Sequence, residues 1–236
     1  MTAKSIKNRD APRRTRARRG EGERLREQIL EAATRLLVET GDEDAVSIRA
    51  VADAVGVTPP SIYLHFADKN ELIFAICERY FDRLGQATME AGAGSEDPIE
   101  RVVLQGRAYI RFGLENPEPY RVLFMRKASA TPLPFQYEKI LESSGFANLV
   151  QAVSDAIEAG RLDGDPMLVA IYLWSAVHGL TSLLISKPDF PWPDKDAVIE
   201  QVTRSAIRGV TVGVNLGPEG RPRGKGESTR RARGSI

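Results

Sequence analysis

The sequence predicts an all-α protein, and three features of the chain support this prediction. Apolar residues recur at spacings of three and four along most of the chain, which is the period of a helix face. Capping residues, prolines and glycines stand where helices of that period would begin and end. No stretch shows the regular alternation of apolar and polar residues that is typical of a half-buried strand. The chain is therefore expected to fold as packed helices.

The first two predicted helices lie close together near the N-terminus. ERLREQILEAATRLLVE (23–39) carries an apolar face at helical period, and Gly41 follows as a stop signal. SIRAVADAVGV (47–57) opens with Ser47, a good N-cap, and reaches its end at Gly56. Both segments are expected to bury one face against the same core.

A much shorter helix is predicted from TPPSIYLHF (58–66). Proline has no amide donor and is accepted in the first turn of a helix, so Pro59 and Pro60 start this helix with the preceding threonine as N-cap. A helix of two turns is not stable by itself in water. We therefore expect Ile62 and Phe66, four residues apart, to hold it against the preceding helix.

Capping residues and prolines predict where the later helices begin. Asp68 and Glu71 resemble a capping box, and an Asp-Pro pair opens two further segments at Asp97 and Asp165. AGAGSED (91–97) is expected to be a linker. The predicted ranges are 68–85, 98–116, 146–160, 166–186 and 196–213.

One of these helices has two interpretations. MLVAIYLWSAVHGLTSLLIS (167–186) is twenty residues without a charge, which is long enough to span a membrane. A helix that is apolar on every side is also typical of the buried centre of a bundle. The polar residues inside it, His178 among them, and the lack of a flanking basic cluster favour the bundle. Because the N-terminus has no secretory apolar region either, we expect a cytoplasmic protein without membrane attachment.

The net charge of +1 conceals a strong partition along the chain. Residues 1–20 hold eight Lys/Arg and one acid, residues 217–236 hold six and two, and the 196 residues between them carry a net charge of −10. Both ends are too polar to bury a core, so 1–20 is predicted to be a disordered basic arm and 217–236 a disordered basic tail. Such ends either bind nucleic acid or are solvated without a partner.

Only Gly56 and Val57 separate the second predicted helix from the short one. Two helices joined by so tight a turn are the signature of a helix-turn-helix, whose second helix enters the major groove of double-stranded DNA. Hydroxyl, imidazole, ammonium and guanidinium groups in and near this motif can donate to phosphates or base edges. The candidate DNA-binding residues are Ser47, Arg49, Thr58, Pro59, Ser61, Tyr63, His65 and Lys69, with Arg16, Arg18 and Arg19 in the arm.

Residues 25–74 closely resemble the N-terminal DNA-binding domain of the TetR family of bacterial regulators. The segments ILEAATRLLVETG, SIRAVADAVGV and TPPSIYLHFADKNEL follow that family's pattern nearly position for position. The resemblance implies a homodimer, a helix-turn-helix DNA-binding domain over 21–69 and an all-helical ligand-binding and dimerisation domain over 70–216. The helices near 166–186 and 196–213 are the candidates for the dimer interface, because the first is apolar on every side and needs a partner to cover it.

The same resemblance assigns roles to single residues of the short helix. Family members use a tyrosine, a histidine and a lysine that match Tyr63, His65 and Lys69 to contact phosphates. Leu64 falls where many members carry a polar or basic residue. It therefore either touches a thymine methyl group or contacts nothing.

A second resemblance concerns AIEAGRLDGDPMLVAIYLWSAVHGLTSLL, which is similar to the TetR C-terminal subtype named for its Trp-His-Gly motif. Trp174 and His178 are four residues apart and therefore share a helix face. They either line a ligand pocket or are packed core residues. Other aromatic residues either line the same cavity or are plain core. The candidate ligand-binding residues are Tyr109, Phe112, Phe124, Trp174 and His178, with Phe135 as a further aromatic, for an unknown and largely apolar small molecule. No cofactor and no metal are expected.

These features favour a ligand-responsive repressor that a small molecule releases from a palindromic operator. Enzyme function is not expected, because the two histidines are 113 residues apart, Cys77 is the one cysteine, and no phosphate-binding loop or metal-ligand cluster is present. A nonspecific or architectural DNA-binding protein, or a ligand-binding protein with no specific operator, is the alternative. The specificity ratio over random DNA separates these hypotheses.

The basic arm generates a prediction of its own. The family resemblance implies that such an arm places arginines in an adjacent minor groove. This positive charge matters because residues 21–69 contain ten acids against five Lys/Arg. Deleting residues 1–19 should weaken operator binding and reduce its salt dependence by a few counterions per dimer. Titrations of labelled operator at several salt concentrations measure that slope, and an unchanged slope would contradict the prediction.

Overall fold

The computed structural model describes residues 20–125 and 144–211. Contacts divide the chain into two compact units: unit 1 is Met1–Gln86 with Phe112–Gly145, and unit 2 is Ala87–Arg111 with Phe146–Ile236. The predictions made for the basic arm, the basic tail, Arg16, Arg18, Arg19 and Phe135 lie outside the described residues.

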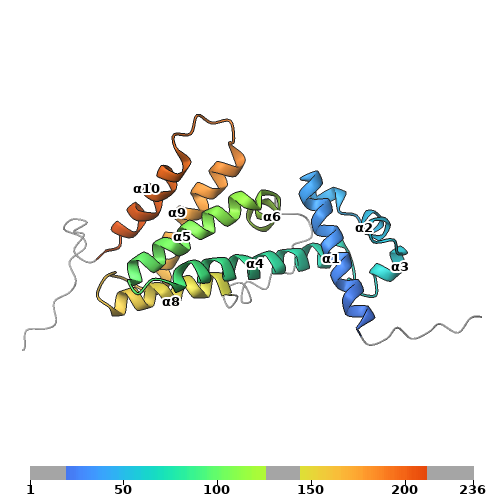
Figure 1. The fold of residues 1–236 in the computed structure, drawn as a ribbon, viewed down its shortest axis with the longest axis horizontal. Coiled ribbons are helices and arrows are strands. Elements are labelled where there is room, and N and C mark those ends of the chain that lie inside the picture. Colours follow the sequence, from blue (N-terminus) through green and yellow to red (C-terminus); the bar gives the residue numbers. More distant parts are fainter. Residues whose placement is uncertain (1–19, 126–143, 212–236) are drawn as a thin grey trace, which may run out of the picture. The chain divides into compact units, whose positions relative to one another are not determined.

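Unit 1 opens with the helix α1, the turn η1 and the helices α2 and α3, and Figure 1 labels the three α-helices. The turn η1 is a single 3-10 turn whose N-cap Asp42 accepts a hydrogen bond from the Asp44 amide. These segments fill the region in which the sequence predicts the helix-turn-helix. Their bounds are α1 Glu21–Thr40, η1 Glu43–Ala45, α2 Ile48–Val55 and α3 Pro59–Ile62.

The apolar faces of these helices form one core. Helix α2 contacts both α1 and α3, and its Val51 and Ala52 are fully buried. Ile62 and Phe66 are buried as well, which confirms that they hold the short helix in place. The α-helical part of that segment ends at Ile62, earlier than predicted, and residues 63–65 continue it as a hydrogen-bonded turn.

The turn between α2 and α3 requires glycine. Gly56 has φ 78° and ψ 33°, in the left-handed region that side chains with a Cβ rarely adopt. Its amide donates to the carbonyl oxygen of Ala52 at 2.9 Å, and the Val57 amide donates to the same oxygen at 3.0 Å. This closes α2 and reverses the chain within two residues, as the sequence predicts.

Predicted caps are present at several helix starts. The Ser47 hydroxyl accepts from the Ala50 amide at 3.1 Å, and Asp165 accepts from the Leu168 amide at 3.0 Å. Asp68 accepts from the Glu71 amide at 2.9 Å, while the Glu71 carboxylate accepts from the Ala67 amide. The Asp68 cap is therefore confirmed at the start of α4, Lys69–Ala93, while Glu71 reaches the amide before the N-cap instead of the Asp68 amide of a capping box.

Helix α4 continues past Gly85, where the sequence predicts its end. Gly85 is buried, and a Cβ placed on Gly145 would lie only 3.5 Å from the Gly85 Cα. This glycine therefore permits a close approach of two backbones instead of terminating a helix. The expected linker shortens accordingly, because α4 reaches Ala93.

The later part of unit 1 contains elements that the periodicity does not predict. After α5, Pro98–Glu115, the chain forms α6, Pro117–Tyr120, and the π-helical turn η2, Arg121–Met125. Asn116 precedes Pro117, which occupies the first turn of α6. Both elements are shorter than two helical turns, and apolar spacing gives no signal over such lengths.

Unit 2 contains a bundle whose core residues come from four helices, seen with their labels in Figure 1. The first part of α5 packs there with α8 Ser144–Glu158, α9 Pro166–Ser186 and α10 Lys195–Arg208. In the described ranges, β-type pairing is limited to one isolated antiparallel bridge between Leu162 and Thr211. The all-α prediction is confirmed. The buried core is Val102, Val103, Ala152, Val153, Ala156, Leu162, Val169, Ala170, Leu173, Ala206 and Ile207.

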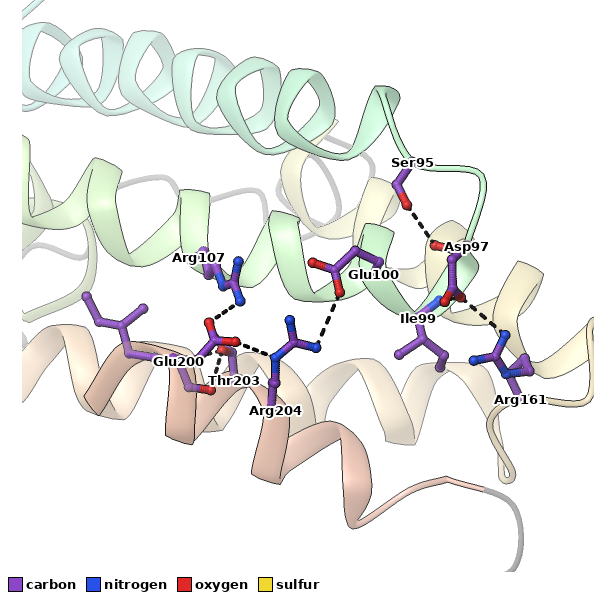
Figure 2. A network of polar contacts seen from close by, with 10 residues as sticks. Ser95, Asp97, Ile99, Glu100, Arg107, Arg161, Glu200, Thr203 and Arg204 are labelled. Atoms are coloured by element: carbon purple, nitrogen blue, oxygen red, sulfur yellow. Dashed lines mark hydrogen bonds and ion pairs between the residues drawn. The ribbon is translucent and has the colours of Figure 1, made fainter. Parts of the chain in front are cut away.

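A polar network joins α5 to α10 on the surface of unit 2 (Figure 2). The Glu200 carboxylate accepts from both Arg107 and Arg204. Arg204 also pairs with Glu100 at 3.3 Å, so two acids and two arginines alternate across the helix pair. The bundle thus has an apolar core and a network of ion pairs at its surface.

Helix α9 is long and apolar enough to cross a membrane by length and composition, the one such helix among the described residues. In the structure it supplies eight buried residues, three of which belong to the core of the bundle. A soluble bundle accounts for such a helix as well as a membrane does.

Candidate functional site

The short helix α3 and the turn after it form the most exposed part of the helix-turn-helix. Tyr63 and Leu64 are open to solvent, with 54% and 82% of their surfaces exposed. Pro60 is exposed and Pro59 partly so. Because Ile62 and Phe66 are buried, the outward side chains of this segment are held on a rigid base.

The hydroxyl groups of the motif already have partners. Thr58 Oγ1 and Ser61 Oγ lie 3.1 Å apart and form a hydrogen bond. Thr58 stands at the N-cap position of α3 without a side-chain capping bond, so its hydroxyl faces Ser61 instead. Ser47 caps α2, as described above, and the neighbouring Arg49 is exposed. Both hydroxyl pairings are solvent-accessible and could exchange for phosphate contacts.

His65 occupies a protected position beside the start of α1. It is partly buried, and a Cβ on Gly22 would lie 3.8 Å from its Cε1 atom. The imidazole therefore lies at the first turn of α1, where backbone amides have no partner within the helix. The structure brings His65 and the N-terminus of α1 together, although 42 positions separate His65 from Glu23 in the sequence.

Lys69 forms an ion pair with an acid that the sequence does not single out. Its Nζ lies 3.2 Å from Asp44 Oδ1, and the Asp44 side chain is almost fully exposed. The two residues are 25 positions apart, and their contact depends on how η1 and the start of α4 pack. The sequence does not identify Asp44 as the partner of Lys69, because the helical period does not predict contacts between residues so far apart.

In unit 2, three of the predicted ligand-binding residues form one cluster. The Tyr109 hydroxyl lies 3.1 Å from His178 Nδ1, and Trp174 Nε1 donates to the same hydroxyl at 3.3 Å. Phe146 packs edge-on against Trp174 with ring centroids 5.9 Å apart. We call Tyr109, Phe146, Trp174 and His178 the Tyr109 cluster.

The electrostatics of the Tyr109 cluster favour a neutral imidazole. Burial lowers the pKa of His178 below its usual value, since desolvation disfavours the charged form. With the ring proton on Nε2, Nδ1 accepts from Tyr109 and the donor chain runs from Trp174 through Tyr109 to His178. The cluster therefore places polar groups in an aromatic setting without a net charge.

The other two predicted ligand-binding residues lie in unit 1. Phe112 is buried edge-on to Tyr80, with ring centroids 6.3 Å apart. Phe124 packs on Phe81 at 5.5 Å and on Tyr120 at 4.8 Å. The structure therefore divides the five candidates into the Tyr109 cluster and an aromatic group of unit 1.

Comparison with known families decides what this arrangement is. The family model described as "Bacterial regulatory proteins, tetR family" matches residues 29–76, which include α2, the Gly56 turn and α3. A second model, described as "Tetracyclin repressor-like, C-terminal domain", matches residues 102–206. The chain belongs to the TetR family. It is a DNA-binding transcriptional regulator, and α2 and α3 are its helix-turn-helix.

Relatives in the TetR family support this assignment. The HTH-type transcriptional activator FasR of Mycolicibacterium smegmatis is 28% identical over 189 residues, covering 79% of this chain and 83% of FasR. The HTH-type transcriptional repressor KstR of Mycobacterium tuberculosis is 27% identical over 161 residues, covering 65% and 73%. A structure of a protein of unknown function from Rhodococcus sp. RHA1 is 25% identical, with a TM-score of 0.69, covering 79% of this chain and 95% of that one.

The C-terminal half is thus TetR-like, but the Trp-His-Gly subtype expected from Trp174, His178 and Gly179 is not confirmed by the model that matches. The individual DNA-binding and ligand-binding residues stay predictions. So does the boundary between residues 69 and 70, because the contact-based units follow a different division of the chain.

The pairing of Lys69 with Asp44 generates a prediction for this TetR-family head. Asp44→Asn should tighten binding of the operator by about two- to fivefold per half-site. In the unsubstituted protein Lys69 must break its exposed ion pair with Asp44 before it contacts a phosphate, and in the variant there is no such pair to break. Asp53→Asn is the matched control, since it removes another exposed acid of the same domain, from α2. Fluorescence-anisotropy titrations measure both, and equal effects of the two variants would contradict a specific role of Asp44.

The network of Figure 2 generates a prediction about pH. A hydrogen bond from Arg204 holds the pKa of Glu200 below its usual value, and the charge of Arg107 acts in the same direction. A carboxyl group whose pKa is lower in the folded state stabilises the fold above its unfolded pKa, about 4.3, and loses that effect as the pH falls through its folded pKa.

Glu200→Gln should therefore lower the thermal midpoint at pH 7, and the difference from the unsubstituted protein should shrink below about pH 4. Thermal melts by circular dichroism between pH 3 and pH 8 measure it. Glu96→Gln, at an exposed position outside the network, is the control and should show no such convergence. A difference that stays constant with pH would show that Glu200 does not act through its charge.

Proposed function

We propose that this TetR-family regulator is a homodimeric repressor that a largely apolar small molecule releases from a palindromic operator. The observation that carries the DNA-binding part is the outward position of Tyr63, on a two-turn segment that the buried Ile62 and Phe66 hold. His65 lies on the same segment, and Lys69 is the first residue of α4. Those three side chains contact phosphates in this proposal, and they orient α3 in the major groove.

A dimer is supported by the surface of α9. Five large apolar side chains of this one helix are exposed to solvent, and an exposed apolar surface is typical of a protein–protein interface. A second copy of α9 and α10 would cover them in a four-helix interface. The exposed apolar residues are Met167, Leu168, Ile171, Tyr172 and Leu183.

The proposed ligand site is the Tyr109 cluster. Its aromatic rings favour an apolar molecule, and the neutral Tyr109 and His178 offer it a hydroxyl and an imidazole without a charge. Binding there would favour a dimer whose two α3 helices no longer fit successive major grooves, which are about 34–36 Å apart. No cofactor takes part in this mechanism, and the protein acts in the cytoplasm, where its DNA is.

Activation is the second candidate. KstR is named a repressor and FasR an activator, so relatives of similar identity carry both names. The position of the operator separates the two roles, because a repressor's site overlaps the promoter that it controls.

The experiment that tests the proposal is selection from random-sequence duplexes by the full-length protein at about 150 mM salt. A palindromic motif bound at least about a thousandfold more tightly than random DNA is the expected result. Retention that is independent of sequence and disappears with salt would overturn the regulator in favour of a nonspecific DNA-binding protein. Transcription in vitro from the cognate promoter then distinguishes repression from activation.

A further inference from the structure

Leu64 is the most exposed of the large apolar side chains in the described part of the chain. It has 82% of its surface open, against 67% for Leu168, the next in order. An apolar side chain stabilises a fold through the surface that it buries, so Leu64 contributes almost nothing to the stability of the head. Because Leu64 lies in the helix-turn-helix, this exposed side chain is available to contact DNA.

Leu64 points away from the core of the head. It lies midway between Ile62 and Phe66, which are 0% and 1% exposed. The backbone between them is helical, since the amides of His65 and Phe66 both donate to the Ile62 carbonyl oxygen, at 2.9 and 3.0 Å. Two positions along a helix turn the side chain by about 200°, so burial of both neighbours places Leu64 on the outer face.

That outer face has no hydrogen-bonding side chain at its centre. Pro60, four residues before Leu64, shares the face and is exposed as well. The Thr58 and Ser61 hydroxyls lie 3.1 Å apart and bond to each other, and the contacts proposed for them and for Tyr63 are to phosphates. A helix that enters the major groove with this face therefore presents apolar surface to the base edges.

One base edge matches such a surface. In the major groove the four bases present hydrogen-bond donors and acceptors, and thymine alone adds an apolar C5-methyl group. Leu64 is flanked by Tyr63 and His65, whose proposed phosphate contacts would set the depth and register of the leucine in the groove.

We propose that Leu64 is a specificity-determining residue that selects thymine by packing against its C5-methyl group in the major groove. This inference rests on the proposed operator binding by α2 and α3. It assigns to the leucine a direct readout of sequence, whereas its two neighbours bind the backbone.

The test uses the full-length protein and the operator selected from random DNA. Each thymine of the half-sites is replaced in turn by deoxyuridine, which removes the methyl group and keeps the base pair. At one symmetry-related pair of thymines, this change should weaken binding about fourfold per half-site and about fifteenfold for the whole palindrome. Leu64→Ala should bind more weakly than the unsubstituted protein and should show no deoxyuridine penalty at that pair.

Two control variants make the result specific. Leu64→Met keeps an apolar side chain of similar volume and should retain the penalty. Val38→Ala removes an exposed apolar group from α1 in the same head and should also retain it. Leu64 is too exposed for its truncation to unfold the head, and equal thermal midpoints of the variants check this.

The outcomes separate the two levels of the proposal. Identical deoxyuridine profiles for the unsubstituted protein and Leu64→Ala, with a motif selected, would overturn the role of Leu64 and leave operator binding intact. Selection of no motif at all would overturn operator binding, and the role of Leu64 with it.

Discussion

Burial of Ile62 and Phe66 is the contact on which the DNA-binding head depends. A helix as short as α3 cannot persist through its own hydrogen bonds, since nucleation costs more than two turns return. These two side chains, four positions apart, are buried where α3 packs on α2, and Arg26 of α1 lies over the Phe66 ring. With the inner face occupied, Tyr63 and Leu64 are forced outward, and the head presents them without needing any further support.

Gly56 sets the geometry of this attachment. Its left-handed conformation lets Ala52 accept two amides at the end of α2 and returns the chain into α3 within two residues. A longer connection would let α3 take several orientations relative to α2, because each added residue brings two soft dihedral angles. The tight turn thus holds the short helix α3 in one orientation relative to α2.

Charge acts differently in the two halves of this TetR-family chain. In the head, where acids outnumber bases, Lys69 is paired with an exposed acid, and such a pair is weak enough to exchange for a phosphate. In unit 2, arginines and acids alternate between α5 and α10. There Glu200 and Arg204 each pair with two opposite charges, and the pairs Arg107–Glu200 and Arg204–Glu100 link the two helices.

The helical class, the helix-turn-helix with its glycine turn and most helix starts could be predicted from the sequence, because caps, prolines and a 3.6-residue period are local signals. Tertiary packing decided the rest. Gly85 reads as a stop in the sequence, yet a neighbouring backbone approaches it and α4 continues. Asp44 gained its importance only by lying beside Lys69, and Tyr109 met Trp174 and His178 across 65 and 69 positions. Contacts over such separations depend on how helices pack, and no spacing along the chain encodes them.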